Sequence, residues 1–375
     1  MILQVNKMYY PDIGGVETVV KQYSEYLKQF DEVVILCIHR NFRLRTTVEK
    51  INGITVYRCA SCGTYMSMPI SLAFFWYLFR LSKRADIIHF HEPFPLGSIG
   101  SLLITKSKRI FVTWHSDIVR QKILKKFIEF FQRKLCEKAE KVIATSERMI
   151  EFSSILKKFR EKVVIIPLSL NKEDYININS FAETNLNSDL LNLPANYVLF
   201  LGRLSYYKGL DVLLDAISIV NENIPFVIAG DGELAGSVNE KIKKSNKKIY
   251  FINRHVSEEE KKYLIMHSKF LVFPSILPSE AFGIIQLEAM VYGKPVINTN
   301  LPTGVPWVSL NDVSGLTVEP SDAFQLARAI EKLYFDEELY KRLSKGALDR
   351  FNKYFDSKVT NELLYSIYFK TNCSS

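Results

Sequence analysis

The chain has 375 residues, of which 47% are hydrophobic and 13% aromatic. This length is enough for two domains with separate cores, and the composition excludes a disordered chain. The formal net charge of +9 favours an anionic partner, which could be a nucleotide, a nucleic acid or an acidic membrane surface.

Neither a signal peptide nor a membrane span is visible in the sequence. Met1 leads directly into the apolar run ILQV, without a basic start and a long apolar stretch. The longest apolar candidate, Ile70–Leu81, contains Arg80 and is shorter than the roughly 18 residues that a spanning helix needs. The five cysteines include a single CxxC pair, Cys59 and Cys62, which favours reduced thiols over a disulfide framework or a zinc site. We therefore expect a cytoplasmic protein.

Apolar runs bounded by turn residues recur along the first half of the chain. They predict strands at Ile2–Val5, Val33–Ile38, Ile54–Tyr57, Ile87–Phe90, Ile110–Thr113, Val142–Ala144 and Val163–Ile166. Amphipathic segments that predict helices, such as Val16–Leu27 and Ile118–Lys138, separate several of these strands. This alternation indicates a parallel sheet with helices on both faces.

A second series of strands follows the polar stretch Asn171–Asn192, which we interpret as the connection between two domains. The strands are predicted at Val198–Leu201, Phe226–Ala229, Ile249–Ile252, Phe270–Phe273, Val296–Ile297 and Leu316–Val318. From Asp322 onward the pattern is helical. We therefore predict an α/β protein of two doubly wound, parallel-sheet domains that face a central cleft, and ligands bind at the carboxyl ends of such strands.

One short element, Phe273–Asn298, offers an anion site between two carboxylates. It is predicted to be a strand, a loop that holds Glu280, and a helix that opens near Gly283 and carries Glu288. Glycine allows close approach of a ligand, and the free N–H groups of a helix start attract anions. A nucleotide-sugar needs this layout, with the diphosphate between sugar and ribose hydroxyls. The alternative is a plain strand-loop-helix unit with two solvated glutamates.

Two loops of the first half follow predicted strands. Gly14 and Gly15 precede a helix, where backbone N–H groups can approach a phosphate or sugar, or simply cap the helix. The pattern is neither GxGxxG nor a Walker loop, which argues against a dinucleotide oxidoreductase or a P-loop NTPase. His115 follows the fifth strand and could bond a sugar hydroxyl or transfer a proton, although a lone histidine is more often structural.

Two loops of the second half also follow strands. Arg203 and Lys208 frame the loop GRLSYYKG, where a guanidinium fork and a mobile ammonium would stabilise a departing diphosphate. The alternative is two solvated surface cations. Gly230 opens the loop GDGE, which we interpret as either a nucleotide-facing loop or an ordinary turn.

Taken together, these motifs resemble the family-4 glycosyltransferases of the GT-B fold. The resemblance rests on FLGRLSYYKGLDVLLDA, the GDGE loop, the E-x7-E pair Glu280 and Glu288, the GGVE loop, WHSD and ATSE, and it runs from about Met1 to about Val318. The segments WHSDIVRQK and LPTGVPWVS look most similar to bacterial enzymes that build O-antigen and other surface polysaccharides, some of them mannosyltransferases.

The resemblance implies a retaining transfer from a nucleotide-diphospho-sugar without a bound metal or other cofactor. It implies that Arg203 and Lys208 bind the diphosphate. Glu280 would bind the sugar hydroxyls and Glu288 the ribose. The other implied site residues are Phe282, Gly283 and Ile284 beside Glu280, Gly230, Gly14 and Gly15 on the phosphate side, and His115 near the reacting centre. By this resemblance, residues 1–180 form the acceptor-side domain and 181–355 the donor domain, and a helix at 356–375 packs back toward the first domain.

The donor expected from the resemblance is GDP-mannose or a UDP-sugar, and the acceptor a saccharide linked to undecaprenyl diphosphate. Such acceptors lie at the cytoplasmic face of the inner membrane, and two basic, aromatic segments, Ile70–Lys83 and Ile118–Lys138, could bind an anionic bilayer peripherally. They could equally be core-packing helices with solvated basic faces. Two other functions stay open: a nucleotide-sugar epimerase of the same fold and a nucleic-acid-binding protein, although no nucleic-acid recognition motif is present.

Overall fold

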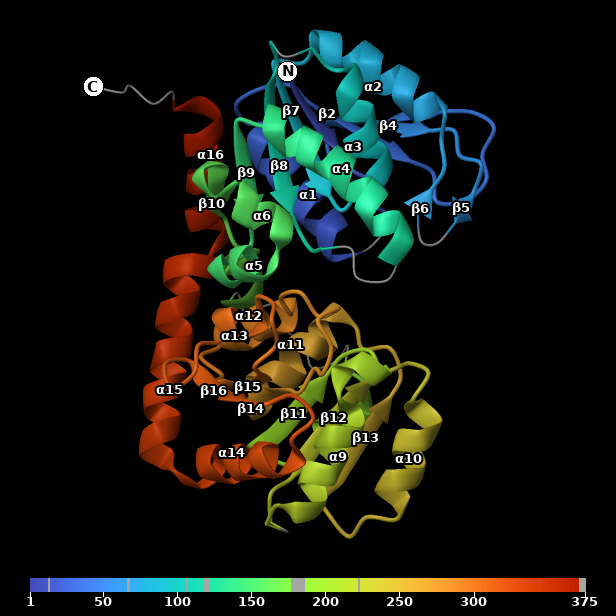
Figure 1. Ribbon diagram of the computed structural model, residues 1–375. Helices are drawn as coiled ribbons and strands as arrows, with labels where there is room; N and C mark the ends of the chain where they lie inside the picture. The colour runs from blue at the N-terminus through green and yellow to red at the C-terminus, as the bar shows by residue number, and fades with distance from the viewer. Residues whose placement is uncertain are drawn as a thin grey trace, which may run out of the picture. The chain divides into compact units, whose positions relative to one another are not determined.

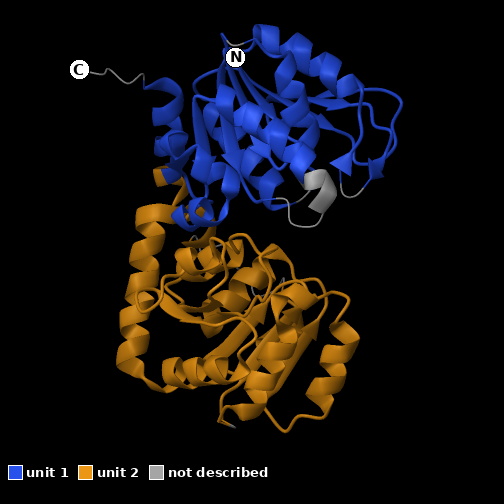
Figure 2. Ribbon diagram, in the orientation of Figure 1, with its two compact units in different colours: residues 1–168, 360–375 blue, residues 169–359 orange. Residues whose placement is uncertain are grey.

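The computed structural model describes residues 1–12, 14–65, 68–105, 107–117, 122–176, 186–221 and 223–370, and it gives only the backbone of residues 122–125. The chain divides into two compact units (Figure 2). Unit 1 comprises residues 1–168 and 360–375, and unit 2 comprises residues 169–359. The predicted boundary at residue 180 is therefore too late, because the chain already belongs to unit 2 at Leu170, whose N–H donates to the carbonyl of Phe355.

Unit 1 is built around an eight-stranded sheet with the order β10-β9-β8-β7-β1-β2-β4-β3 (Figure 1). Every neighbouring pair is parallel except β3 and β4. The strands are β1 (Ile2–Val5), β2 (Val33–Ile38), β3 (Thr47–Ile51), β4 (Ile54–Cys59), β7 (Ile87–Glu92), β8 (Arg109–Trp114), β9 (Lys141–Ala144) and β10 (Val163–Ile165). A small antiparallel pair, β5 (Thr64–Tyr65) and β6 (Met68–Pro69), stands apart.

Helices cover both faces of this sheet. They are α1 (Gly15–Leu27), α2 (Ala73–Arg84), α3 (Pro95–Gly100), α4 (Lys122–Lys138), α5 (Glu147–Phe152), α6 (Ser154–Lys158) and α16 (Ser357–Phe369), with single 3₁₀ turns at Ser101–Leu103 and Arg160–Lys162. Alternate strand residues point to opposite faces: Leu3 and Val5 join the core beneath α2, α4, α5 and α6, whereas Ile2 joins the core beneath α1 and α16.

The C-terminal helix α16 enters unit 1 at Thr360. Its Tyr368 is fully buried and stacks on Phe111 of β8, and the guanidinium of Arg109 donates to the carbonyls of Ile367 and Tyr368. The last part of the chain thus completes the core of unit 1.

Unit 2 holds a six-stranded, wholly parallel sheet with the order β13-β12-β11-β14-β15-β16. Its strands are β11 (Tyr197–Leu201), β12 (Phe226–Gly230), β13 (Ile249–Asn253), β14 (Ser268–Phe273), β15 (Val296–Thr299) and β16 (Gly315–Val318). Its helices are α7 (Glu173–Ile176), α8 (Ser188–Leu191), α9 (Leu210–Ile219), α10 (Ala235–Lys243), α11 (Glu258–His267), α12 (Ile284–Met290), α13 (Val305–Val308), α14 (Ala323–Phe335) and α15 (Glu337–Arg350), with a 3₁₀ turn at Tyr206–Lys208 and a π-helical turn at Phe351–Phe355.

The prediction of two doubly wound, parallel-sheet domains is confirmed. The strands expected from apolar runs are present in both units, because strands buried on both faces carry continuous apolar residues. Strand β3 was not predicted, because its largely polar residues lie at the exposed edge of the sheet and form no apolar run. The expected connection at 171–192 falls partly outside the described residues, as does the start of the helix expected at 118–138.

Glycines allow the loops of unit 2 to approach one another closely. Gly209 has φ 72° and ψ 29°, and a Cβ atom added there would lie 2.0 Å from the carbonyl oxygen of Pro274. Gly230, at the end of β12, approaches Gly202 in the same way, with 1.9 Å between an added Cβ and the Gly202 carbonyl oxygen. Both contacts join the ends of neighbouring strands.

We expect Gly209→Ala to lower the free energy of unfolding by at least about 2 kcal/mol, because the side chain adds a left-handed backbone penalty to a clash with Pro274. Gly236→Ala is the matched control: Gly236 is exposed in α10, and an added Cβ meets nothing within 4 Å. That control should raise stability by about 0.5–1 kcal/mol. Urea denaturation of both variants measures the difference, and equal stabilities would contradict the close approach at Gly209.

Candidate functional site

Each sheet has one point at which the strand order reverses. In unit 2 this point lies between β11 and β14, because β12 and β13 continue on one side and β15 and β16 on the other. In unit 1 it lies between β1 and β7. The loops that leave the carboxyl ends of these strands diverge there and leave room for a ligand, so they are the first places to look for a site.

The loops after β11, β12 and β14 form one connected surface in unit 2. The N–H of Ile276, after β14, donates to the carbonyl of Tyr207 at 2.9 Å. The N–H of Leu204, after β11, donates to the carbonyl of Asp231 in the GDGE loop at 2.9 Å. The glycine contacts at Gly209 and Gly230 belong to the same surface. The structure thus brings together three loops that the sequence placed only separately after strands.

An ion pair joins two of these loops. Lys208 Nζ lies 2.5 Å from Glu280 Oε2, and the side chains are only 14% and 12% exposed. Ser275 Oγ donates to the same carboxylate oxygen at 3.3 Å, and the ammonium lies 4.9 Å from the ring centre of Phe273. Glu280 and Lys208 are therefore not solvated surface groups, and the carboxylate is fixed at the junction of β11 and β14.

Arg203 is placed differently from Lys208. Its side chain is exposed and makes no hydrogen bond or ion pair with the described residues, although it follows the same strand. Both cations lie in the loop between β11 and α9, as expected from the sequence. Among the described residues the guanidinium has no acceptor, whereas the Lys208 ammonium is paired with Glu280.

Helix α12 begins at Ile284, directly after Gly283. Gly283 has φ 79° and ψ 75°, and an added Cβ would lie 2.6 Å from the ring of Phe273. Phe282 is buried, and its carbonyl accepts from Nε2 of Gln286 at 2.8 Å. The predicted start of this helix is confirmed, and the reason for its glycine is the close aromatic ring.

Glu288 is buried inside unit 2 and bound by two residues that the sequence analysis missed. Lys261 Nζ lies 2.6 Å from Oε1, and the hydroxyl of Tyr175 donates to the same oxygen at 3.2 Å. Burial opposes the charge of Lys261, but Glu288 and Glu258 outweigh it and raise the pKa of the ammonium. Burial, together with Glu288, raises the pKa of the Tyr175 phenol. No sequence motif predicts these partners, because α7 and α11 contact α12 only in the folded unit.

The glycines of the GGVE loop stand at the start of α1 in unit 1. Gly14 is the extended residue before the helix, which begins at Gly15. A Cβ added at Gly14 would lie 2.3 Å from Oε2 of Glu17, whose side chain is buried in the first turn. Glu17 Oε1 has no hydrogen-bond partner among the residues that the structure describes. Gly14 therefore makes room for a buried carboxylate.

His115 follows β8 and belongs to a group of buried imidazoles. Its Nε2 lies 3.1 Å from Nδ1 of His91, and Nε2 of His91 lies 2.8 Å from Oε1 of Gln4. Burial, reinforced by Lys7, lowers the pKa of His115 to about 3, so this imidazole is neutral at physiological pH. The sequence analysis singled out His115 but not Gln4 or His91, although the pattern IIHFHE of β7 shows polar residues alternating with apolar ones.

A cavity of about 690 Å³ opens at the carboxyl ends of β1, β2 and β4 in unit 1. It is lined by Lys7, Met8, Arg40, Asn41, Phe42, Gly63 and Thr64. Arg40 is paired with Asp12 at 3.0 Å, whereas the Lys7 ammonium has no hydrogen-bond or ion-pair partner among the described residues. This cavity therefore keeps one uncompensated positive charge.

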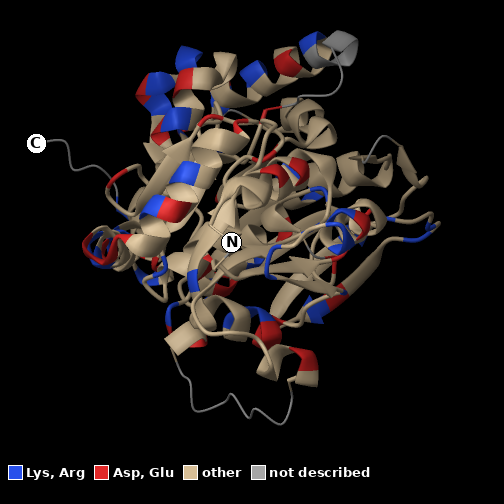
Figure 3. Ribbon diagram, turned by 90° about the horizontal axis from the view of Figure 1, so that it is seen from below, with Lys and Arg blue, Asp and Glu red and all other residues tan. Residues whose placement is uncertain are grey.

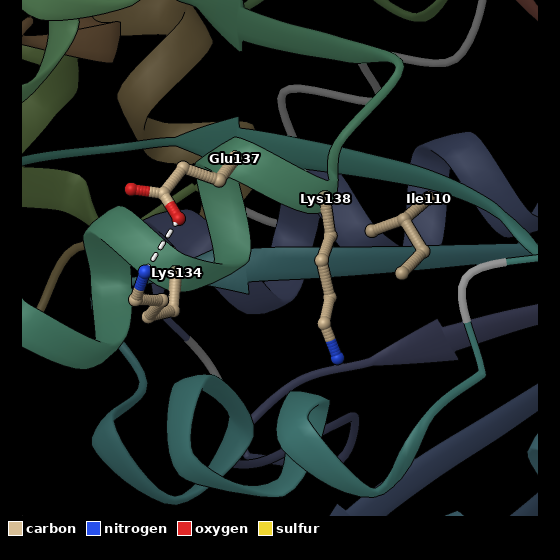
Figure 4. Close-up of a pocket in the computed structure, with 4 residues that line it drawn as sticks. All are labelled: Ile110, Lys134, Glu137 and Lys138. Carbon is tan, nitrogen blue, oxygen red and sulfur yellow. Dashed lines mark hydrogen bonds and ion pairs between the residues drawn. The ribbon is translucent and has the colours of Figure 1, made fainter.

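A second cavity of unit 1, of about 430 Å³, lies between β8 and α4 (Figure 4). Lys134 pairs with Glu137 at 2.8 Å, and Lys138 donates to the carbonyls of Ser101 and Ile104. Ile110 lines it near the amino end of β8. Because its ammonium groups already have acceptors and it lies away from the carboxyl edge, this cavity is a poor candidate for the site. Within the described ranges no group of three His, Cys, Asp or Glu could hold a metal ion.

Two family models match the chain one after the other. Glycosyltransferase Family 4 matches residues 13–173, and Glycosyl transferases group 1 matches residues 182–350. The chain is 30% identical over 359 residues to D-rhamnosyltransferase WbpZ of Pseudomonas aeruginosa, which covers 94% of this chain and 92% of that protein. It is 29% identical over 372 residues to O-antigen chain mannosyltransferase C of Escherichia coli, with 98% and 97% covered.

Solved structures show the same architecture. Sucrose-phosphate synthase of Thermosynechococcus elongatus has a TM-score of 0.75 at 19% identity and covers 100% of this chain and 99% of its own. HepE of Anabaena, solved with UDP, has a TM-score of 0.76 at 17% identity, with 99% and 100% covered. The two Rossmann-like units thus have the GT-B fold. The chain belongs to the glycosyltransferases that these two family models describe, and it is an enzyme that transfers a sugar.

The family resemblance assigns Lys208 to the departing diphosphate, where a cation would stabilise the transition state by about 3 kcal/mol, so we expect Lys208→Ala to lower kcat by roughly 10²–10³-fold. Lys241→Ala is the matched control, since Lys241 pairs with Asp211 on the exposed surface of the same unit at 2.8 Å. The control should keep its kcat within about twofold. Steady-state kinetics and a melting curve for each variant separate turnover from folding, and a fully active Lys208→Ala would remove this residue from the site.

Proposed function

We propose that this protein is a retaining hexosyltransferase of surface-polysaccharide assembly. It transfers mannose from GDP-mannose to a saccharide linked to undecaprenyl diphosphate, in the synthesis of O-antigen or capsule. The observation that carries the proposal is the Lys208–Glu280 pair at the reversal point of the unit 2 sheet. It sets a cation for the leaving diphosphate and a carboxylate for sugar hydroxyls side by side.

The relatives support the proposed pathway and acceptor. Two of them are named an O-antigen chain mannosyltransferase and a D-rhamnosyltransferase. A third, from Campylobacter jejuni, is 24% identical with 94% of each chain covered, and its name describes transfer to a saccharide on PP-undecaprenol. A UDP-sugar is the competing donor, as HepE was solved with UDP-glucose.

In this proposal the donor is held by unit 2. The exposed guanidinium of Arg203 grips the diphosphate with its free donors, and Lys208 adds the second charge, so that no metal ion is needed. The backbone at Gly283, which packs against the Phe273 ring, approaches the sugar beside Glu280, with Phe282 and Ile284 on either side. Gly230 keeps the GDGE loop against the Gly202 carbonyl, beside the same site.

The ribose is assigned to Glu288. Lys261 and Tyr175 already hold one oxygen of this carboxylate, Oε1, which fixes its orientation. The second oxygen is the acceptor for a ribose hydroxyl. Glu288 and the Tyr175 side chain are buried and Lys261 is largely buried, so the ion pair of Glu288 is shielded from water.

The acceptor is assigned to unit 1. Its 690 Å³ cavity lies at the carboxyl edge of the sheet and contains the uncompensated ammonium of Lys7, which suits an anionic or strongly polar glycan. The same ammonium is close enough to His115 to lower the pKa of that imidazole. The cavity and His115 therefore belong to one neighbourhood, with Gly14 and Gly15 following the same strand β1.

Exposed apolar and basic side chains occur in the segment after β2 that lines this cavity, in β5 and along α2, and together we call them the hairpin patch. It consists of Phe42, Arg43, Leu44, Arg45, Tyr65, Leu72, Trp76 and Arg80. The segments are tied together, since Arg43 and Ser61 exchange two backbone hydrogen bonds at 2.9 Å. In α4, Phe127 and Phe130 are also exposed, whereas Ile128 is buried. No helix among the described residues is long and apolar enough to cross a bilayer. We assign the hairpin patch and α4 to peripheral contact with an anionic membrane.

The two other functions receive less support. The relatives reported above are named as transferases, and none of these names describes an epimerase. Lys and Arg are interspersed with Asp and Glu along the ribbon (Figure 3), rather than forming the single-sign stripe expected of a nucleic-acid-binding face.

The donor is tested by a thermal-shift panel of GDP-, UDP- and dTDP-sugars, followed by transfer to a lipid-linked acceptor. A donor at 100 times its Kd stabilises the folded state by about 2.7 kcal/mol, so GDP-mannose should give the largest shift. The anomeric configuration of the product, read by NMR, should match that of the donor. Interconversion of the sugar without an acceptor would instead identify an epimerase, and a shift only with UDP-sugars would overturn the choice of base.

Membrane contact is tested by flotation with vesicles that contain anionic phospholipid. We expect the wild type to float at low salt, and Leu44→Glu with Leu72→Glu to bind less, because two charges would enter the hairpin patch. Phe335→Glu is the matched control, as Phe335 is an exposed aromatic residue of α14 in unit 2. If the control loses binding as strongly as the double variant, or if the wild type stays unbound, the patch has no such role.

A further inference from the structure

Polar side chains cross the sheet of unit 1 within its core. Gln4 of β1 is paired in register with His89 of β7, and His91, two residues further along β7, is paired with Thr113 of β8. All four side chains are buried and lie on the sheet face covered by α1 and α16. The site residue His115 follows two residues after Thr113. A row of hydrogen-bonding groups thus leads from the centre of the sheet to His115 at the carboxyl end of β8.

The hydrogen bonds in this row fix which nitrogen carries each proton. Gln4 Oε1 can only accept, so Nε2 of His91, at 2.8 Å, must carry a hydrogen. Burial lowers the pKa of His91 well below its usual value, so its ring is neutral and Nδ1 is an acceptor. Nε2 of His115, 3.1 Å from that atom, must then donate. The neutral His115 ring is left with an unprotonated Nδ1, and no described residue is hydrogen-bonded to it.

Ring stacking supports this neutral arrangement. The His89 and His91 rings are 4.5 Å apart between centroids, and the His91 and His115 rings are 5.4 Å apart, with interplanar angles of 23° and 19°. A proton on any ring would place a charge against the face of its neighbour in a buried environment, which is costly. His89 has separate partners in Thr113 and Tyr368, so it does not compete for Gln4.

We propose that Gln4, acting through His91, is a positioning residue that holds His115 as the tautomer with a free Nδ1 acceptor, and that this nitrogen accepts a hydrogen bond from a hydroxyl of the transferred sugar. The inference rests on the proposed function for its ligand. It gives His115 the role of a neutral acceptor that orients the sugar, not that of a proton donor. Selection would therefore favour sugars that present a hydroxyl at this position.

The spectroscopic test uses the full-length protein labelled with ¹⁵N-histidine. The protein has six histidines, so six imidazoles must be assigned. A long-range ¹H–¹⁵N spectrum should show His91 and His115 protonated at Nε2 alone at neutral pH. Gln4→Glu keeps an acceptor and should preserve both tautomers. Gln4→Leu removes the acceptor and should give mixed tautomers. His91→Phe keeps a ring in the stack but has no nitrogen to accept from His115. It replaces Gln4→Leu if that variant does not fold, and it should give mixed tautomers at His115. A proton on Nδ1 of wild-type His115, or a charged ring, would overturn the proposal.

The kinetic test compares the wild type with the same variants on the donor and on its monodeoxy analogues. Gln4→Leu should lower kcat/KM about tenfold with the full donor, the loss expected for one hydrogen bond. With the analogue that lacks the recognised hydroxyl, wild type and Gln4→Leu should have equal kcat/KM values. Gln4→Glu should, like the wild type, prefer the full donor over this analogue. An equal loss with every analogue would show a merely structural role and overturn the assignment of the hydroxyl. If the histidines show the expected tautomers but the protein transfers no sugar, the proposed function is overturned instead.

Discussion

The site of unit 2 depends on one ion pair, between the ammonium of Lys208 and the carboxylate of Glu280. Removing two charges from water is costly unless each has a partner at close range, and here the 2.5 Å contact and the Ser275 hydroxyl supply that compensation. The pair is possible because Gly209 lets the loop after β11 approach the loop after β14. Backbone freedom at one glycine therefore sets the geometry of a charged site.

The two units use buried polar groups in different ways. In unit 2 the buried charges are neutralised locally, as Glu288 is by Lys261. In unit 1 the two imidazoles of β7 are neutral, since burial lowers the pKa values of His89 and His91 below the physiological range. Neutral imidazoles carry direction through their tautomers without the desolvation cost of a charge. The proposed function thus draws on a charged centre in unit 2 and on uncharged imidazoles in unit 1, which are built from different residues.

The effect of the positive net charge on ligand binding depends on the local partners of each cation and not on a uniform field. Many cations are paired, such as Lys134 with Glu137, and they contribute little to ligand binding. Besides Lys208, the cations that matter for the proposed function are Arg203 in unit 2 and Lys7 in unit 1, which have no carboxylate partner among the described residues. The basic residues of the hairpin patch stand beside exposed aromatic side chains, which suits the interface of a bilayer rather than a groove for nucleic acid.

The sequence by itself determined the two doubly wound sheets, because runs of apolar residues at strand length can only be buried between layers of helices. It also placed Lys208, Glu280 and His115 directly after strands, where parallel sheets collect their ligands. Only the tertiary structure decided which of these groups meet. The pairing of Lys208 with Glu280, the burial of Glu288 beside Tyr175, and the row from Gln4 through His91 to His115 join residues far apart in the chain. Such contacts follow from strand order and register, which leave no local pattern, since a glutamine in a strand looks the same whether it faces solvent or a histidine.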